Sequence, residues 1–304
     1  SIRRQRQMCI RDRINTLFSA KVSLSEFIFM FLSFLFDKRT VKNLYFYQKI
    51  CYNMYHYSTV NAKKKDKIIK RSSFNMRIRF KQWARPELEA SAFYIDNPED
   101  YKGKWKELFE NDNPIHLELG CGKGQFISQL AVQNDNVNYI AVDLVDAMLG
   151  LAKRNVESTY KEQEKEIKNV FLTRYDIERI LNILDKNDGI ERIYINFCNP
   201  WPRGKHRKKR LTHTRQLEKY REFLKDEGEI FFKTDDDGLF NDSLNYFTEC
   251  GFEILDKTYD LEHTPNFWNN IMTEHEKMFM EQGIKIKALK AKKKIKHKNK
   301  NNYI

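Results

Sequence analysis

Short apolar runs alternate with amphipathic stretches along residues 114–288, and this alternation predicts strands that are followed by helices. Runs rich in branched and aromatic residues have the length and composition of buried strands at residues 114–119, 138–143, 170–174, 192–197, 229–233, 252–255 and 284–288. Helical periodicity or composition predicts helices over residues 125–132, 146–168, 177–184, 214–224, 238–250 and 273–282. Strands that alternate with helices predict an α/β fold, in which a mostly parallel sheet carries helices on both faces.

Residues 1–75 do not share this pattern. The apolar run at residues 27–36 is too short to span a bilayer, no signal-peptide cleavage site follows it, and the opening RRQRQMCIRDR resembles translated sequencing adapter. We therefore expect residues 1–75 to be a non-native or disordered basic extension, with Met76 as the natural start. The functional alternative for this extension is a membrane-surface or RNA-binding arm. We expect residues 76–290 to form the folded domain and residues 291–304 to be a lysine-rich tail.

The positive charge of the chain is unevenly placed. The formal net charge is +13, yet residues 76–282 hold 30 Lys/Arg against 38 Asp/Glu. Within this acidic body, residues 203–210 carry six Lys/Arg and no acid. Such a run is often only a solvated face, but on an acidic body it would localise contacts with the phosphates of a nucleic acid.

The basic run directly follows a predicted strand and a stiff loop. In the loop, Asn199-Pro200-Trp201-Pro202, two prolines prevent both strand and helix from continuing. Ligands of open α/β sheets bind beyond the carboxyl ends of the strands. The arrangement therefore favours a site that holds an anionic polymer beside a small ligand, although Asn-Pro-Trp-Pro alone is more often a simple turn.

The cysteines and histidines give no sign of a metal site. There are five cysteines and no Cys-x-x-Cys pair, which favours a reduced, cytoplasmic environment over a zinc site or a disulfide scaffold. Neither His206 nor His213 has a second ligand at helical spacing. We expect no metal and no membrane partner.

A glycine-rich turn and three acids indicate a nucleoside-like ligand. The turn ELGCGKG, residues 118–124, has Gly-x-Gly-x-Gly spacing, which differs from the Gly-x-Gly-x-x-Gly of dinucleotide binders and makes an NAD-dependent oxidoreductase a poor candidate. Glu118 can accept a hydrogen bond from an ammonium group, Asp143 can hold the ribose hydroxyls, and Asp176 can face an adenine amine. Each acid alone is more often a helix cap or a surface charge. Together they fit S-adenosylmethionine, which is cationic and has no phosphate.

Five stretches resemble the bacterial tRNA (guanine-N7-)-methyltransferases. They are MRIRFKQWARPE from Met76, ELGCGKG from Glu118, INFCNPWPRGKHRKKRLTH from Ile195, FFKTDDDGLF from Phe231 and TEHEKMF from Thr273. The resemblance covers residues 76–290 and keeps the order and spacing of the motifs. It implies the class I methyltransferase (Rossmann-like) fold, with a seven-stranded sheet and one antiparallel edge strand. It also implies S-adenosylmethionine as cofactor and tRNA as partner, with methylation at guanine 46. The sequence leaves monomer or homodimer open.

Carried over by position, the resemblance assigns roles to individual residues. It assigns cofactor contacts to Glu118, Gly120, Gly122, Asp143, Asp176 and Asn199. It assigns contacts with the tRNA guanine to Arg203, Asp235, Thr273, Glu274, His275 and Glu276. It assigns the RNA backbone to Lys205, His206, Arg207, Lys208, Lys209 and Arg210. Without the resemblance, Asp235 would be a turn or cap residue, and Thr273 with Glu276 would form a capping box.

Asn199 departs from the family, which usually has an aspartate proposed as catalytic at this position. Guanine N7 carries a free lone pair, so its methylation needs no prior deprotonation, and in-line alignment supplies most of the acceleration. We therefore expect Asn199 to position the reactants and the enzyme to be active. A methyltransferase for another substrate and a non-catalytic RNA-binding protein on the same scaffold remain the alternatives.

Overall fold

The computed structural model describes residues 79–264, 267 and 270–295. The extension expected at residues 1–75 and residues 296–304 of the expected tail lie outside the described residues. Within the described part, no helix combines the length and the apolar content needed to cross a membrane.

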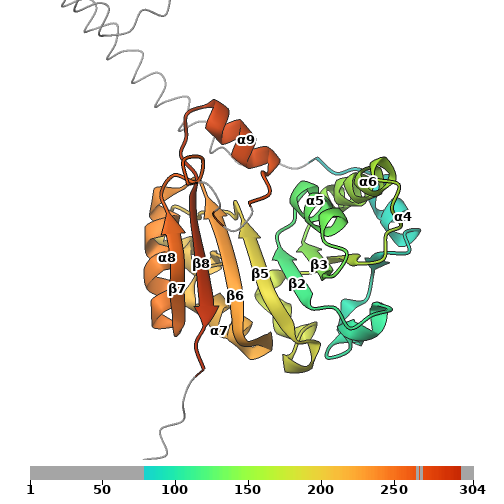
Figure 1. Cartoon of the computed structure of the whole chain (residues 1–304), viewed down its shortest axis with the longest axis horizontal. Helices are drawn as coiled ribbons and strands as arrows, with labels where there is room; N and C mark the ends of the chain where they lie inside the picture. Colours follow the sequence, from blue (N-terminus) through green and yellow to red (C-terminus); the bar gives the residue numbers. More distant parts are fainter. Residues whose placement is uncertain (1–78, 265–266, 268–269, 296–304) are drawn as a thin grey trace, which may run out of the picture. The chain divides into compact units, whose positions relative to one another are not determined.

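The described residues form one eight-stranded sheet with the order β1-β4-β3-β2-β5-β6-β8-β7 (Figure 1). All pairs from β1 to β6 are parallel, whereas β8 is antiparallel to both β6 and β7. The strands are β1 Tyr94–Ile95, β2 Ile115–Leu119, β3 Asn138–Asp143, β4 Val170–Arg174, β5 Ile190–Asn196, β6 Leu224–Thr234, β7 Phe252–Thr258 and β8 Lys287–Lys293.

Side-chain alternation along the central strands gives the sheet two apolar faces. Ile193 and Ile195 of β5 belong to one buried cluster, whereas Tyr194 between them belongs to another. In β6, Phe232 and Phe231 divide in the same way. Successive side chains of a strand point to opposite faces, so continuous apolar strands require cover on both sides.

Two groups of helices supply this cover. Buried side chains of α5 and α6 join the cluster of Tyr194, and α4 packs on α6. Buried side chains of α7 and α8 join the cluster of Ile193. The helices are α4 Ala84–Glu89, α5 Gln125–Gln133, α6 Asp146–Glu162, α7 Thr214–Phe223, α8 Asp237–Glu249 and α9 Glu274–Glu281. The 3-10 helices are η2 Pro98–Tyr101, η3 Trp105–Leu108, η4 Ile177–Asn182, η5 Lys186–Asp188 and η6 Gly204–Lys209. The predicted mostly parallel α/β sheet with helices on both faces is confirmed.

The sheet differs from the prediction in strand number and in the place of its antiparallel strand. The eighth strand is the two-residue β1, which pairs with β4 at the edge and is too short to leave a pattern in the sequence. The antiparallel strand β8 is not at the edge, because it lies between β6 and β7.

Strand β8 also reaches into the stretch that was expected to be a tail. It ends at Lys293, whereas the predicted strand ended at residue 288. Leu289 and Ala291 are buried in the core, while Lys290 extends to Glu229 with 2.8 Å between Nζ and Oε1. The lysines thus occupy strand positions at which their ends reach acids of β6, so a lysine-rich composition conceals a core strand.

Candidate active site at the carboxyl ends of the strands

The glycine turn joins β2 to α5 and packs tightly against α6. Gly124 has φ of +71°, and a Cβ atom at this position would lie 2.6 Å from the Cβ of Ala152. The backbone nitrogens of Gly120 and Cys121 both donate to the carbonyl oxygen of Val142, over 2.8 and 3.1 Å. The positive φ and the close approach both require glycine at residue 124.

Asp143 ends β3 and is bonded to the glycine turn. Its Oδ2 accepts from the Gly122 nitrogen over 2.9 Å, and its Oδ1 accepts from the Val145 nitrogen over 3.0 Å. Burial raises the pKa of Asp143, and the backbone donors oppose this shift. The structure therefore places Asp143 against the glycine turn.

A cavity of about 190 Å³ opens beside the turn. Its walls come from Glu118 and the turn, from Asn196 and Phe197 at the end of β5, and from Thr273, Glu274 and His275 at the start of α9. Segments that are distant in the sequence thus share one hollow at the carboxyl ends of β2 and β5, which is where an open α/β sheet binds its ligands.

Glu118 is the buried acid of this cavity and is only 2% exposed. Its Oε1 accepts from Nδ2 of Asn196 over 3.0 Å, while its Oε2 has no hydrogen-bond partner among the described residues. Burial raises the pKa of Glu118 to about 7, although the bond from Asn196 and the charge of Lys233 lower it. A buried acceptor without a partner is costly unless a ligand supplies a donor.

Sequence reasoning missed Asn196 and Phe197. Asn196 follows the buried run of β5, which pairs with β2 so that Tyr194 lies opposite Glu118. Phe197 has φ of +51° and stacks on His275, with ring centroids 5.9 Å apart and planes inclined by 22°. The sequence does show a polar residue, Asn196, at the end of a predicted strand. It does not show that this strand, β5, is the neighbour of β2, which carries Glu118.

Several of the predicted site residues are not among the residues that line this cavity in the described part of the chain: Asp143, Asp176, Asn199, Arg203 and Asp235. Oδ1 of Asp176 caps η4 by accepting from the Glu178 nitrogen over 2.9 Å. Asn199 is exposed, and its Oδ1 accepts from the Trp201 nitrogen over 3.0 Å. Asp235 is half-buried, which raises its pKa. Asp176 therefore has the cap role that the sequence held open, and Asn199 stabilises its own turn.

The first turn of α9 has the capping box that the sequence held open as an alternative. Oγ1 of Thr273 accepts from the Glu276 nitrogen over 3.0 Å, and Oε2 of Glu276 accepts from the Thr273 nitrogen over 3.4 Å. Glu274 faces outward to Lys123, with 2.9 Å between Oε1 and Nζ, so this pair joins α9 to the glycine turn. Thr273, Glu274 and His275 line the cavity, whereas Glu276 is buried behind them.

The chain is similar in sequence to proteins of one known family. The family model described as "Putative methyltransferase" matches residues 112–289. The tRNA (guanine-N(7)-)-methyltransferase of Clostridium botulinum strain Alaska E43 is 61% identical over 214 residues, which cover 70% of this chain and 97% of the relative. The protein of the same name from Clostridium beijerinckii is 60% identical over 218 residues, or 72% and 99%.

The chain belongs to the tRNA (guanine-N(7)-)-methyltransferase family. The solved structure of an antibiotic-related methyltransferase aligns with 65% of this chain over 94% of its own length, at 20% sequence identity. Its TM-score of 0.47 is too low to support the assignment.

In this family member, the basic run after the proline loop forms the 3-10 helix η6. Lys205, Lys208 and Lys209 are exposed, and Nζ of Lys209 lies 5.3 Å from the centroid of the Trp201 ring. Arg203 is exposed at the start of the run. These cations leave an open positive face beside the loop.

Arg210 differs from the rest of the run because its side chain is only 3% exposed. Its Nε donates to the Pro200 carbonyl over 2.7 Å, and a second nitrogen lies 2.6 Å from Oδ2 of Asp242. Arg207 lies 3.5 Å from the same oxygen but stays exposed. The prediction that Arg210 contacts the RNA backbone is corrected, because a buried guanidinium that anchors the loop cannot also reach a phosphate.

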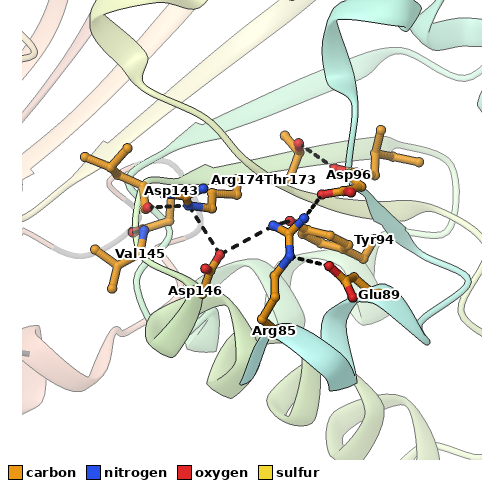
Figure 2. A network of polar contacts seen from close by, with 11 residues as sticks. Arg85, Glu89, Tyr94, Asp96, Asp143, Val145, Asp146, Thr173 and Arg174 are labelled. Carbon is orange, nitrogen blue, oxygen red and sulfur yellow. Dashed lines mark hydrogen bonds and ion pairs between the residues drawn. The ribbon is translucent and has the colours of Figure 1, made fainter. Parts of the chain in front are cut away.

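A polar network fixes the segment that follows Asp143 (Figure 2). Arg85 of α4 forms ion pairs with Glu89 and Asp96 and donates to the hydroxyl of Tyr94. Its guanidinium also lies 3.8 Å from Oδ1 of Asp146. Arg174 of β4 lies 3.3 Å from the same oxygen and donates to the Leu144 carbonyl over 3.1 Å. The network therefore ties α4 and β4 to the residues beside Asp143.

Proposed function

We propose that this chain transfers a methyl group from S-adenosylmethionine to N7 of a guanine in tRNA, at position 46 by resemblance to the family. The observation that carries the proposal is the shared cavity. A buried, half-satisfied Glu118 and the glycine turn line one side of it, and the first turn of α9 lines the other. The names of relatives at about 60% identity support tRNA as the substrate.

The residues around the turn fit the cofactor. The free Oε2 of Glu118 is an acceptor for a cationic amino group, and the Asp143 carboxylate keeps acceptor sites beyond its two backbone bonds for ribose hydroxyls. When bound, S-adenosylmethionine supplies an electrophilic methyl group on a sulfonium. In our proposal Gly120 and Gly122 let the backbone come close to it, while Asp176 and Asn199 stand farther out, as a cap and in a turn.

Methylation at N7 depends on alignment of the reactants and needs no proton transfer from the guanine. The N7 lone pair forms the new N–C bond as the C–S electron pair passes to sulfur, and no proton leaves the guanine. In our proposal Arg203, Asp235 and the first turn of α9 orient the base, because holding the reactants in line removes much of the entropic barrier. Asn199 stiffens the loop through its bond to the Trp201 nitrogen, which agrees with a positioning role.

The exposed cations of η6 are the proposed contacts with the tRNA backbone. Lys205, Lys208 and Lys209 are exposed, and His206 packs on Trp201 with ring centroids 5.7 Å apart. Phosphate contacts of this kind carry little sequence information and serve to place the RNA. We expect the enzyme to act in the cytoplasm, where tRNA is modified.

The test is to incubate the full chain with S-adenosylmethionine carrying a labelled methyl group and with unmodified tRNA, and then to digest the RNA to nucleosides. The proposal predicts label in 7-methylguanosine. Label in another nucleoside, or in protein or small molecules, would assign the site to another substrate. Binding of both ligands without transfer would support an RNA-binding protein on the same scaffold.

A further inference from the structure

Lys233 is a buried cation behind the cavity, and each proton of its ammonium group donates a hydrogen bond. Lys233 is next to last in β6 and is only 1% exposed. Its Nζ donates to Oε2 of Glu276 over 2.9 Å, to Oδ1 of Asn270 over 2.8 Å and to the Ile271 carbonyl over 3.1 Å. An ammonium group has three protons, and all three are used here, as its burial requires.

Both oxygens of its partner carboxylate, Glu276, also accept hydrogen bonds. Glu276 is 2% exposed. Its Oε2 accepts from Lys233 and from the Thr273 nitrogen, and its Oε1 accepts from Nδ2 of Asn270 over 2.6 Å. Both oxygens thus face inward, toward β6 and the start of α9. The neighbouring Glu274 and His275 are exposed and line the cavity.

Lys233 contacts two walls of the cavity, one through its backbone carbonyl and one through its side chain. The Phe197 nitrogen donates to the Lys233 carbonyl over 2.9 Å, and Phe197 stacks on His275. Nζ of Lys233 lies 5.1 Å from the centroid of the Phe126 ring, which lines the cavity on the side of the glycine turn. Lys233 therefore connects the end of β5, the turn side and the first turn of α9.

We infer that the Lys233–Glu276 pair is a positioning device, which sets the first turn of α9 against the cavity so that Glu274 and His275 face the guanine. Glu276 then acts through Thr273 and His275, and does not itself touch the base. The inference rests on the proposed function, because it assigns a task to the guanine side of that site. Stability alone does not explain the pair, since a well-packed apolar pair of similar volume is often as stable as a buried ion pair.

Two variants separate positioning from stability. Lys233→Met leaves the Glu276 charge buried without its partner, and we expect a large fall in Tm. The double variant Lys233→Met with Glu276→Met removes both charges, and we expect most of the Tm to return. If the pair positions α9, kcat/KM for tRNA stays at least about tenfold low in the double variant, while Kd for S-adenosylmethionine changes by less than about threefold.

The controls use the same helix and a direct measure of its order. Glu281→Gln changes an exposed acid at the far end of α9, and we expect wild-type values of Tm and kcat/KM. Hydrogen exchange of residues 273–281 reports local opening. We expect faster exchange there in the double variant than in wild type or Glu281→Gln.

Recovery of both Tm and kcat/KM in the double variant would overturn the inference, because the pair would then serve stability alone. A Glu276→Gln variant that loses activity with unchanged exchange at residues 273–281 would also overturn it, in favour of direct contact with the base. If wild type makes no 7-methylguanosine, the proposed function fails. The exchange comparison then still decides whether the pair orders α9.

Discussion

At the scale of single residues, the site depends on how burial changes ordinary side chains. Burial raises the pKa of Glu118 from its usual 4.5 to about 7. A carboxyl group whose folded pKa is raised favours the folded state when protonated, and this contribution is lost as the pH rises through the folded value. Glu118 therefore lowers the stability of the protein without cofactor above neutral pH, as expected of a group kept for a cationic ligand.

Glu118→Gln tests this cost directly. Relative to wild type, the variant should gain stability as the pH rises from 4 to 8, so that its free energy of unfolding increases by up to about 3 kcal/mol, which is the value of the pKa shift. Denaturant titrations at several pH values measure it. The same variant should bind S-adenosylmethionine about tenfold or more weakly at pH 8, because a charged hydrogen bond is lost. A pH-independent difference in stability would contradict the account.

Asn199 is the other residue whose role can be tested by one substitution. Its amide oxygen holds the turn at Trp201, and the reaction needs no base, so Asn199→Asp should keep the turn and change kcat by less than about tenfold. Single-turnover methylation of tRNA gives this rate. A rise of several orders of magnitude would show that a carboxylate is needed for the chemistry and that positioning alone is not the role.

At the scale of elements, the strands and most helices follow from the sequence because both faces of the sheet are buried. Strands β2, β3 and β4 match the predicted runs within a residue. The sequence predicted a tail where the last residues of lysine-rich β8 lie. It does not show that lysines of this strand reach acids of β6, as Lys290 reaches Glu229. The spacing in the sequence placed Asp143 at the end of a strand beside the glycine turn, and the structure has the two in contact. Asn196 and the burial of Glu276 were not predicted, since both depend on which strands and helices become neighbours.

The basic run at residues 203–210 combines an anchor with a contact surface, and variants should separate the two. Arg210→Ala leaves Asp242 without its 2.6 Å partner, so it should lower the free energy of unfolding by about 2 kcal/mol or more. Lys208→Ala removes an exposed cation and should change stability by less than about 0.5 kcal/mol. Thermal or denaturant unfolding measures both. Equal effects would contradict the different roles assigned to the two residues.

At the scale of the whole molecule, charge separates recognition of RNA from recognition of the cofactor. Residues 76–282 carry more acids than bases, so the exposed cations of η6 stand out against an acidic body. Binding of tRNA should therefore weaken steeply with salt, whereas binding of S-adenosylmethionine should change little. The double variant Lys205→Ala with Lys208→Ala should flatten the slope of log K against log salt by about 2, one for each lost phosphate contact. An unchanged slope would place the RNA on another face.

In the proposed function, one cavity holds a methyl donor against N7 of a guanine. This proposal is tested most directly with a ligated tRNA that carries 7-deazaguanosine at position 46, where carbon replaces N7 and only the acceptor lone pair is lost. We expect this tRNA to bind with nearly the same Kd as the unmodified one and to receive no methyl group in a single turnover, while the unmodified tRNA receives one. Methylation of the 7-deaza tRNA at an equal rate would contradict the proposal.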